Sequence, residues 1–378
     1  MHTVYFSLGS NLGHKHFFLQ KAILLMQEHL GVVQKVSPVY DSPAWGFSGD
    51  DFLNACISLE THKSPEEVLS AVLFIEKQLG RVRSLESGYQ PRTIDIDILY
   101  YDNLHLKGDD LQIPHPQMHL RAFVLRPLTD IAPQFYHPVL RKDTRNLVQE
   151  CRDKSALNKA SFKLFKSQEL LFSQVQFMAI EGNIGAGKTT LAKKIASDFN
   201  AKLVLERFAD NPFLPKFYED QARYAFPLEM SFLADRYQQF MDDTAQYDLF
   251  KSFMISDYDV HKSLIFAKIT LQQEEFNLYR KVFGFMYKEV VVPKMYVYLH
   301  QNTVRLLENI KKRGRTYEQN IEEAYLEKIQ HGYMNFIKSY PEKNVLILDV
   351  SNLDFIEEEK DYTYILDELQ KFVINQQI

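Results

Sequence analysis

The feature that most constrains the fold is a glycine-rich segment, GNIGAGKTT, at residues 182–190. It matches the pattern G-x-x-x-x-G-K-[ST], in which backbone N–H groups turn toward an anion because glycine has no Cβ atom. The hydrophobic run VQFMAIE at 175–181 precedes it, and TLAKKIASDF at 190–199 follows with helical character. This order of strand, glycine loop and helix predicts a phosphate-binding loop at a helix N-terminus.

Residue types within this loop fit the chemistry of a nucleoside triphosphate. The Lys188 side chain is long enough to reach the β- and γ-phosphates, and the Thr189 hydroxyl is placed to ligate Mg²⁺. The loop therefore indicates ATP or GTP as a substrate and leaves the acceptor open. The other residues expected to bind ATP here are Gly182, Asn183, Ile184, Gly185, Ala186, Gly187 and Thr190.

Strands and helices alternate along the rest of the C-terminal half. Short hydrophobic runs predict strands, and the longer segments between them carry apolar residues at helical spacing. Such alternation indicates a parallel α/β sheet with helices on both faces. We expect strands at 202–206, 252–256, 294–299 and 344–349, and helices at 227–246, 262–289, 303–313 and 322–339.

The N-terminal half has a more mixed pattern, which favours an α+β sandwich. Strands are expected at 3–8, 32–40, 52–60 and 94–101, with helices at 16–30 and 65–79. A chain of 378 residues is long for one domain, since domains typically hold about 100–200 residues. We therefore expect a ferredoxin-like α+β sandwich over 1–155, a linker over 156–174, and a P-loop α/β kinase domain with a parallel sheet and a lid over 175–378.

Composition excludes several classes of function. A net charge of −5 argues against a nucleic-acid partner, because such partners usually require a basic surface. The two cysteines, Cys56 and Cys151, form neither a disulfide framework nor a zinc-binding spacing, which fits a reducing compartment. The N-terminus lacks the pattern of a signal peptide, and no apolar run approaches the roughly 18 residues that span a bilayer. We expect a cytoplasmic protein without membrane contact.

Two charged segments follow the phosphate loop. Glu206 ends the expected strand at 202–206, so its carboxylate belongs at the carboxyl edge of the sheet, where a base for an attacking hydroxyl is needed. Farther along, KKRGRTYEQ at 311–319 carries Arg313 and Arg315. Arginines in a lid stabilise charge on a transferring phosphoryl group, because they are planar and always charged.

Two more segments follow Glu206: NPFLPKFYED at 211–220 and FPLEMSFLADRYQQ at 226–239. With the phosphate loop, Glu206 and the arginine-rich segment, they make residues 176–370 resemble the deoxynucleoside kinase family. The resemblance implies that Glu206 activates the 5′-hydroxyl of the sugar and that Tyr218 contacts its 3′-hydroxyl. It also implies a homodimer formed through the helices around 227–246 and 262–289. The residues that match the base-reading and lid positions are Glu229, Arg236, Arg313, Arg315 and Glu318.

This segment departs from the family pattern in three places. The Glu-Arg-Ser stretch expected after the third strand reads MISDYDV at 254–260, where Asp257 is the only functional remnant. Asn309 occupies the position of an earlier lid arginine, and Glu229 replaces the base-reading amide. These changes affect base specificity more than the type of reaction.

The carboxylate at Glu229 predicts which base the preferred deoxynucleoside carries. An ionised carboxylate only accepts hydrogen bonds, and guanine offers two adjacent donors where adenine and cytosine each present an acceptor. We therefore expect a purine preference, with deoxyguanosine favoured over deoxyadenosine and Arg236 keeping Glu229 ionised. The alternative is that Glu229 pairs only with Arg236 and never meets the base.

The N-terminal half carries a second strong signal, RTIDIDIL at 92–99. Alternation places Asp95 and Asp97 on the same face of a strand, about 6–7 Å apart. Two acids on one face also occur in ordinary edge strands, but here arginines surround them. Carboxylates spaced for Mg²⁺ and ringed by cations suit a polyphosphate. The surrounding residues are Arg81, Arg83, Arg92, His115 and Arg121.

Four further segments accompany this strand: GSN at 9–11, DFLNACISLET at 51–61, EKQLGRVR at 76–83 and IPHPQMHLRAFVL at 113–125. On these segments, residues 3–150 resemble 6-hydroxymethyl-7,8-dihydropterin pyrophosphokinase. The resemblance implies that the pterin hydroxymethyl oxygen attacks the β-phosphorus of ATP and that AMP leaves. Tyr89 departs from the tryptophan that is frequent in the family's mobile loop. By this resemblance the two metals bind Asp95 and Asp97, ATP binds Glu76, Arg81, Arg83, Arg92, His115 and Arg121, and the pterin binds Asn11, Phe52, Asn54 and Phe123.

The sequence thus predicts a bifunctional enzyme whose partners are small molecules: ATP, hydroxymethyldihydropterin and a deoxynucleoside. One rival is an active pyrophosphokinase fused to a P-loop module that binds a nucleotide without turning it over. Intact Lys188, Thr189 and Glu206 argue against this. A nucleoside monophosphate kinase would need arginines for the acceptor phosphate, where 206–236 offers aromatic and acidic residues instead. No feature favours a structural assembly protein.

Overall fold

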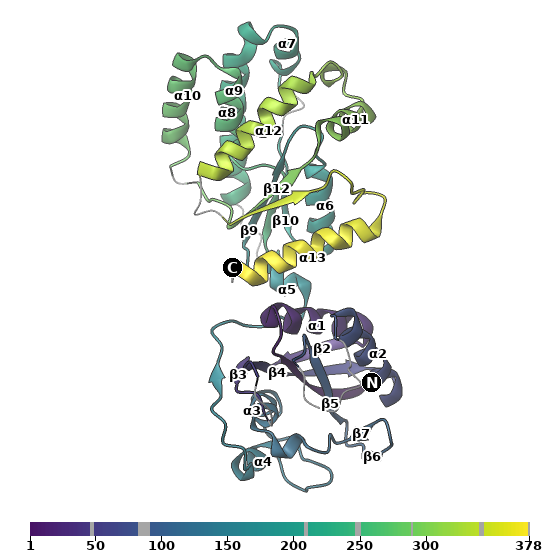
Figure 1. The fold of residues 1–378 in the computed structure, drawn as a ribbon. Helices are drawn as coiled ribbons and strands as arrows, with labels where there is room; N and C mark the ends of the chain where they lie inside the picture. The colour runs from purple at the N-terminus through teal and green to yellow at the C-terminus, as the bar shows by residue number, and fades with distance from the viewer. Residues whose placement is uncertain are drawn as a thin grey trace. The chain divides into compact units, whose positions relative to one another are not determined.

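A computed structural model describes residues 1–45, 49–81, 91–207, 211–245, 251–288, 290–339 and 344–376 of the chain. These residues form two compact units, 1–171 and 172–376, each with its own sheet and helices (Figure 1). No helix among the described residues is long and apolar enough to cross a membrane.

Unit 1 is built on an antiparallel sheet of six strands in the order β5-β1-β4-β3-β8, with β2 paired to β4. This confirms the α+β class expected for the N-terminal half. A short hairpin of β6 and β7 lies outside this sheet. The strands are β1 His2–Ser10, β2 Val32–Val36, β3 Tyr40–Ser42, β4 Phe52–Thr61, β5 Asp95–Tyr101, β6 Leu106–Lys107, β7 Gln112–Ile113 and β8 Asn158–Lys159.

Side chains alternate between the two faces of the sheet along each strand. Both faces therefore carry apolar residues, and helices cover both. Ile57 and Ile96 belong to the core beneath α1 and α2, whereas Cys56 and Leu99 belong to the core beneath α3 and α4. By the same alternation, Asp95 and Asp97 share the face of Leu99. The helices are α1 Lys15–His29, α2 Pro65–Gln78, η1 Met118–Leu120, α3 Ala122–Ile131 and α4 Thr144–Glu150. Helix α5, Gln168–Ser173, spans residue 171, where unit 1 ends along the chain.

The segment 156–174, which we expected to be a linker, contains both β8 and α5. Residues 158 and 159 pair with β3. The Gln20 side chain of α1 binds the backbone of Phe165, donating through Nε2 and accepting through Oε1, both at 2.7 Å. Much of this segment therefore packs as part of unit 1.

Unit 2 contains a parallel sheet of five strands in the order β10-β11-β9-β12-β13, which confirms the expected parallel α/β class. The strands are β9 Phe177–Gly182, β10 Lys202–Val204, β11 Met254–Ser256, β12 Met295–His300 and β13 Val345–Asp349. The helices are α6 Lys188–Asp198, α7 Leu214–Glu219, α8 Gln221–Ala245, α9 Lys262–Thr270, α10 Gln273–Met286, α11 Thr303–Arg313, η2 Thr316–Glu318, α12 Glu323–Ser339 and α13 Glu359–Gln376.

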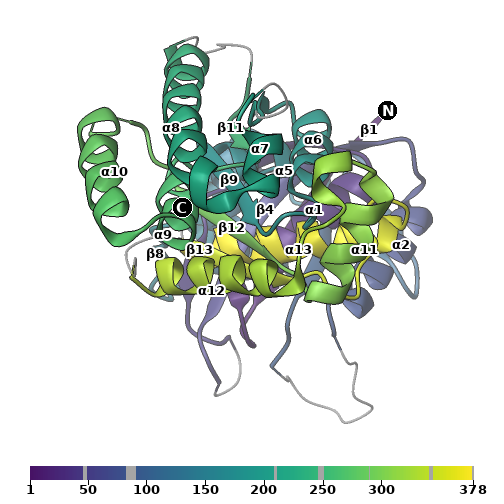
Figure 2. The same ribbon diagram turned by 90° about the horizontal axis from the view of Figure 1, so that it is seen from above.

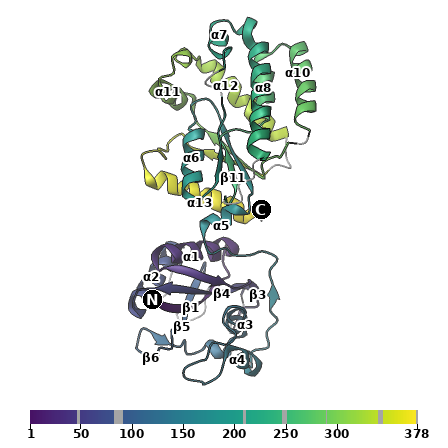
Figure 3. The same ribbon diagram turned by 180° about the vertical axis from the view of Figure 1, so that it is seen from behind.

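The helices of unit 2 form two groups. Helix α6 pairs with α13, where the Tyr362 hydroxyl donates to Asp198 at 2.6 Å. Helices α8, α9 and α10 share a cluster of apolar side chains. Figure 1 shows the three helices together, and Figure 3 shows α8 and α10 side by side. Helix α7 packs against α8, as the view from above also shows (Figure 2). Helix α12 approaches α9 closely because Gly332 has no side chain: a Cβ atom there would lie 2.9 Å from Ile269.

Two expected elements are each divided in the structure. The helix expected over 262–289 is α9 and α10, because extended backbone at Gln272 starts a new helix in a capping box with Glu275. The strand expected over 32–40 is β2 and β3, separated around Pro38, which lacks the N–H group that a sheet requires.

Parallel pairing brings the carboxyl ends of β9, β10 and β11 to one edge of the sheet. The phosphate loop follows β9, Glu206 follows β10, and Asp257 follows β11. Ligands of open α/β sheets bind at this edge, so the fold places these three sequence features together.

Candidate active sites

The pocket of unit 1 lies over neighbouring strands on one face of the sheet. Gly9 of β1 is paired with Asn54 of β4 on one side and with Asp95 of β5 on the other. A Cβ atom at Gly9 would lie 3.3 Å from the Asn54 side-chain oxygen, so glycine leaves room above the strand. The pocket is lined by Ser7, Gly9, Ser42, Pro43, Trp45, Phe52, Asn54, Arg81, Arg92, Asp95, Asp97, His115, Arg121 and Phe123.

Asp95 is held by two arginines. Arg81 and Arg92 each donate to a different carboxylate oxygen, both at 2.5 Å. Glu76 is buried behind them, where it accepts from Arg81 and from the Ile96 N–H group at 2.9 Å. Glu76 therefore supports Arg81 and is not among the residues that line the pocket.

The negative charge of Asp97 is less well balanced by nearby cations than that of Asp95. Arg121 lies 3.6 Å and His115 4.0 Å from its carboxylate. Burial, reinforced by the negative charge of Asp95, raises the pKa of Asp97 to about 7. Burial and the charge of Arg121 lower the pKa of His115 to about 4, so this imidazole is neutral at pH 7. A divalent cation at this carboxylate pair would favour the ionised form of Asp97.

Aromatic side chains form the other wall of the pocket. Phe52, Phe123 and Trp45 all line it, with the Trp45 and Phe123 rings 6.3 Å apart. The Arg121 guanidinium lies 5.2 Å from the centre of the Trp45 ring, in a cation–π contact. Sequence reasoning missed Trp45, although it is the only tryptophan of the chain.

Asn11 is also placed differently from what we expected, and two named positions lie outside the described residues. Asn11 does not line the pocket; it accepts from the Arg92 N–H group at 2.8 Å and donates to the Arg92 carbonyl through its own N–H group at 3.1 Å. It thus positions Arg92 rather than facing the pocket. Arg83 and Tyr89 fall outside the described residues.

In unit 2 the phosphate loop has the backbone that its glycines predict. Gly185 and Gly187 have φ values of +83° and +88°, a region that other residues rarely adopt. The Lys188 ammonium donates to the carbonyls of Gly182 and Asn183 at 3.0 and 2.9 Å. Burial, together with repulsion from Lys262, lowers the Lys188 pKa to about 8.

Other loop residues support this conformation. The buried Asn183 side chain donates to the Leu326 carbonyl and accepts from the Ile184 N–H group, both at 2.8 Å. Ala186 is buried, and Thr190 lies exposed in the first turn of α6. The Thr189 hydroxyl, expected to ligate Mg²⁺, donates to Asp257.

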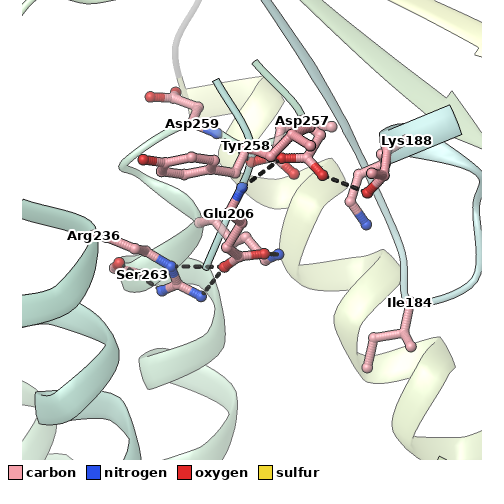
Figure 4. A network of polar contacts seen from close by, with 12 residues as sticks. Ile184, Lys188, Glu206, Arg236, Asp257, Tyr258, Asp259 and Ser263 are labelled. Atoms are coloured by element: carbon pink, nitrogen blue, oxygen red, sulfur yellow. Dashed lines mark hydrogen bonds and ion pairs between the residues drawn. The ribbon is translucent and has the colours of Figure 1, made fainter. Parts of the chain in front are cut away.

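Glu206 lies between cations that sequence reasoning did not assign to it (Figure 4). Arg236 donates to its Oε1 atom through Nε and Nη2, at 2.9 and 2.7 Å. Lys262 donates to Oε2 at 2.6 Å. The Glu206 N–H group donates to Asp257 at 2.8 Å. Burial opposes ionisation, but Lys262 and Arg236 outweigh it and lower the Glu206 pKa to about 2.

Glu229 does not have the partner that we expected. Arg236 binds Glu206 and Ser263 instead, and no ion pair to Glu229 is found among the described residues. Its Oε1 atom accepts from the Thr270 hydroxyl at 3.1 Å, while buried Oε2 has no partner among the described residues. Burial raises the Glu229 pKa to about 7, opposed by the charge of Arg236.

Glu229, Tyr218 and the lid residues line one pocket with Glu206. The Tyr218 ring stacks on Tyr317, with centroids 6.1 Å apart. Both lid arginines, Arg313 and Arg315, are ion-paired with buried Glu318. Asn309 donates to the Gly185 carbonyl at 2.9 Å and so supports the phosphate loop.

The site therefore combines a phosphate loop with Glu206, whose carboxylate is bound by cations, and a lid that carries arginines. It also contains the buried Oε2 atom of Glu229, which has no hydrogen-bond partner among the described residues. Lys262 is the residue that sequence reasoning missed here. Its signal was weak, because one lysine after MISDYDV has no motif of its own.

Comparisons with known proteins divide the chain in the same way. A family model described as deoxynucleoside kinase matches residues 178–374. A model described as 7,8-dihydro-6-hydroxymethylpterin-pyrophosphokinase matches residues 5–133.

Individual relatives match each half over nearly their whole length. A deoxyguanosine kinase from Bacillus subtilis (strain 168) is 36% identical over 203 residues, which are 52% of this chain and 98% of that protein. A 2-amino-4-hydroxy-6-hydroxymethyldihydropteridine pyrophosphokinase from Aquifex aeolicus (strain VF5) is 39% identical over 151 residues, 40% of this chain and 92% of that protein. A solved structure of deoxyadenosine kinase from M. mycoides aligns with a TM-score of 0.45 and 25% identity, covering 52% of this chain and 99% of that one.

Proposed function

Since the chain belongs to the deoxynucleoside kinase family through residues 178–374 and to the hydroxymethyldihydropterin pyrophosphokinase family through residues 5–133, we propose that one polypeptide performs both reactions. Unit 1 would transfer pyrophosphate to hydroxymethyldihydropterin, a step of folate biosynthesis. Unit 2 would phosphorylate the 5′-hydroxyl of a deoxynucleoside, a salvage reaction. Buried, unbridged Cys56 and Cys151 suit the cytoplasm for both, because thiols stay reduced there.

The pyrophosphokinase proposal rests on the carboxylate pair beneath the aromatic wall. Phe52 and Phe123 would hold the pterin ring, and Asn54 would read its amide edge, beside Asp95 and Asp97. The hydroxymethyl oxygen releases its proton to water and forms a bond to the β-phosphorus of ATP, the bond from that phosphorus to the α-phosphate oxygen breaks, and AMP leaves. Arg92 and Arg121 line the same pocket, where their charge would stabilise the phosphates.

Mg²⁺ is part of this proposal. Among the described residues there is no cluster of three metal-ligating side chains, but Mg²⁺ typically needs only one or two carboxylates plus substrate phosphates. The Asp95 and Asp97 oxygens fit that donor set in unit 1, and the Thr189 hydroxyl fits it in unit 2. When bound, the ion would neutralise phosphate charge.

The kinase proposal rests on Glu206, which lines the same pocket as Lys188 and the lid arginines. The 5′-hydroxyl oxygen attacks the γ-phosphorus, its proton passes to Glu206, and ADP leaves. Tyr218 would contact the sugar. Arg313 and Arg315 would turn from Glu318 to the transferring phosphoryl group, where fixed cations offset its charge.

We further propose a purine base, with deoxyguanosine preferred. The unpartnered Oε2 atom of Glu229 is buried in this pocket, and leaving such an atom without a hydrogen bond is costly. Guanine N1–H and its amino group would supply two donors to the Glu229 carboxylate, and these donors would favour its ionised form against the burial that raises its pKa. That the Bacillus subtilis relative is a deoxyguanosine kinase supports this choice.

The rival function, an active pyrophosphokinase fused to a non-catalytic nucleotide-binding module, is disfavoured by the three donors that keep Glu206 ionised. A binding module has no use for such an arrangement.

One assay of the full chain tests both reactions. With ATP and Mg²⁺, hydroxymethyldihydropterin should yield AMP, and each deoxynucleoside should yield ADP with the highest specificity constant for deoxyguanosine. Failure to form AMP or ADP would refute the corresponding activity. A highest constant for deoxycytidine or thymidine would refute the purine preference alone.

A further inference from the structure

The Glu206 carboxylate is fixed from two sides. Arg236 occupies Oε1 with two N–H donors, and Lys262 donates to Oε2 at 2.6 Å. Both cations are buried. They are also linked, because Arg236 donates to Ser263, the residue after Lys262, at 2.8 Å. The first turn of α9 therefore binds one oxygen of the carboxylate through Lys262 and contacts, through Ser263, the arginine that binds the other.

The geometry leaves one oxygen of Glu206 available. An ionised carboxylate has about four lone-pair sites, two on each oxygen. Arg236 uses two on Oε1, and Lys262 uses one on Oε2, so among the described residues a site is left only on Oε2. The oxygen that can accept a substrate hydroxyl is thus the one that Lys262 holds.

Lys262 stands at an unfavourable place for a cation. It is the first residue of α9, and a helix N-terminus favours negative charge. Burial and the proximity of Lys188, which Lys262 repels, add to this cost. The ion pair with Glu206 at 2.6 Å offsets it. The Lys262 charge is therefore stabilised in this position chiefly by its contact with Glu206.

We propose that Lys262 is a positioning residue of the kinase reaction, which orients Glu206 so that Oε2 receives the proton of the acceptor hydroxyl. The proposal rests on the deoxynucleoside kinase function of unit 2. It also gives the segment after β11 a role: this stretch lacks the arginine of the family pattern, and Lys262 supplies a buried cation a few residues later.

The first test compares three variants of the full chain with ATP and deoxyguanosine. Lys262→Met should lower kcat by about 10- to 100-fold, the effect expected for one charge-assisted hydrogen bond. The KM for deoxyguanosine should change by less than about threefold, because the nucleoside contacts remain. Lys262→Arg should restore most of the activity. Lys268→Met, which changes an exposed lysine of the same helix, should match the wild type.

A double-mutant cycle tests whether Lys262 acts through Glu206. In a Glu206→Gln background, Lys262→Met should have little further effect on kcat. Independent, multiplicative losses would overturn the proposal, as would a Lys262→Met variant with near-wild-type kcat or one that only raises KM.

Folding and function are separated by two controls. Lys262→Gln provides a smaller change should Lys262→Met fail to fold, and it should show the same loss of kcat without loss of the pterin activity. A wild-type chain that phosphorylates no deoxynucleoside would refute the proposed function itself. An active wild type with unaffected Lys262 variants would refute only this inference.

Discussion

Asp95 and Asp97 stand two residues apart on β5, yet their electrostatic surroundings differ. Two arginines bind Asp95 at 2.5 Å, whereas Arg121 lies 3.6 Å from Asp97. The pKa of Asp97 therefore rises to about 7, through burial and the charge of Asp95. A bound cation would lower that pKa again, so the proposed Mg²⁺ would balance the charge of this pair.

Replacing either aspartate by alanine should abolish AMP formation from ATP and hydroxymethyldihydropterin, because the metal and phosphates lose a ligand. Deoxynucleoside phosphorylation by the same chain should continue, and it serves as the internal measure of folding. Asp110→Ala, an exposed aspartate outside the pocket, is the control. Near-wild-type pterin turnover in Asp95→Ala or Asp97→Ala would remove the metal assignment.

The raised pKa of Glu229 makes the stability of the folded protein depend on pH. This pKa rises from 4.5 to about 7 in the folded protein, chiefly through burial. The folded state therefore keeps a proton that the unfolded state has released, and stability falls as pH rises through this window. Glu229→Gln cannot ionise, so from pH 5 to pH 8 it should lose less stability than the wild type, by about 1–3 kcal/mol. Thermal melting at both pH values measures this difference.

The same variant tests the base. An amide both donates and accepts, so Glu229→Gln should shift preference away from deoxyguanosine, which steady-state kinetics with four deoxynucleosides would show. Glu327→Gln makes the same change at an exposed position of α12 and should alter neither property. An unchanged ranking would mean that Glu229 does not meet the base.

The sequence predicted the placement of candidate residues where a motif carried them and failed where pairing depends on packing. Lys188, Asp95 and Asp97 lie where their motifs predicted. The predicted partner of Arg236 was wrong. Spacing along α8 suggested Glu229, whereas the fold brings Glu206, which follows β10, to Arg236. Lys262 and Trp45 lacked any recognisable pattern, and only the pocket reveals them.

At the scale of elements, hydrophobic periodicity predicted the strands well and the breaks between elements less well. No glycine or proline separates α9 from α10. Their separation depends on the capping box between Gln272 and Glu275, a local interaction that periodicity does not detect. By contrast, the junction of β9 and α6 was predictable, because its glycines are required by the backbone.

Gly187 illustrates that requirement. Its φ of +88° is unfavourable for other residues, and a Cβ atom would lie 2.7 Å from Phe355. Gly187→Ala should distort the loop, cost about 1–3 kcal/mol of local strain, and lower kcat/KM for ATP in the kinase assay at least about tenfold. Pterin turnover should not change.

The matched control is Gly284→Ala. This helical glycine of α10 has open space around its Cβ position, so alanine should be neutral or stabilising by about 0.5–1 kcal/mol. Equal kinase activity in Gly187→Ala and the wild type would contradict the strain argument.

At the scale of the whole molecule, each unit has its own sheet and hydrophobic cores. The proposed reactions also release different products, AMP from unit 1 and ADP from unit 2. Both activities can therefore be followed in one sample. A substitution in one site then has the activity of the other site as its folding control.

Helices α8 and α10 carry exposed apolar side chains through which we expect two copies of the chain to assemble. Leu278 and Phe285 lie seven residues apart on α10, and so on one face of the helix, with exposed fractions of 53% and 83%. Met241 on α8 is also exposed. Exposed apolar side chains of this kind favour burial against a second copy. The full chain should sediment at micromolar concentration with twice its 44.3 kDa mass. Phe285→Glu should shift it to the monomer, since a charge replaces the most exposed ring, while Phe74→Glu on α2 of unit 1 should leave the dimer intact. A wild-type monomer, or a dimer that only Phe74→Glu disrupts, would show that α10 is not the contact.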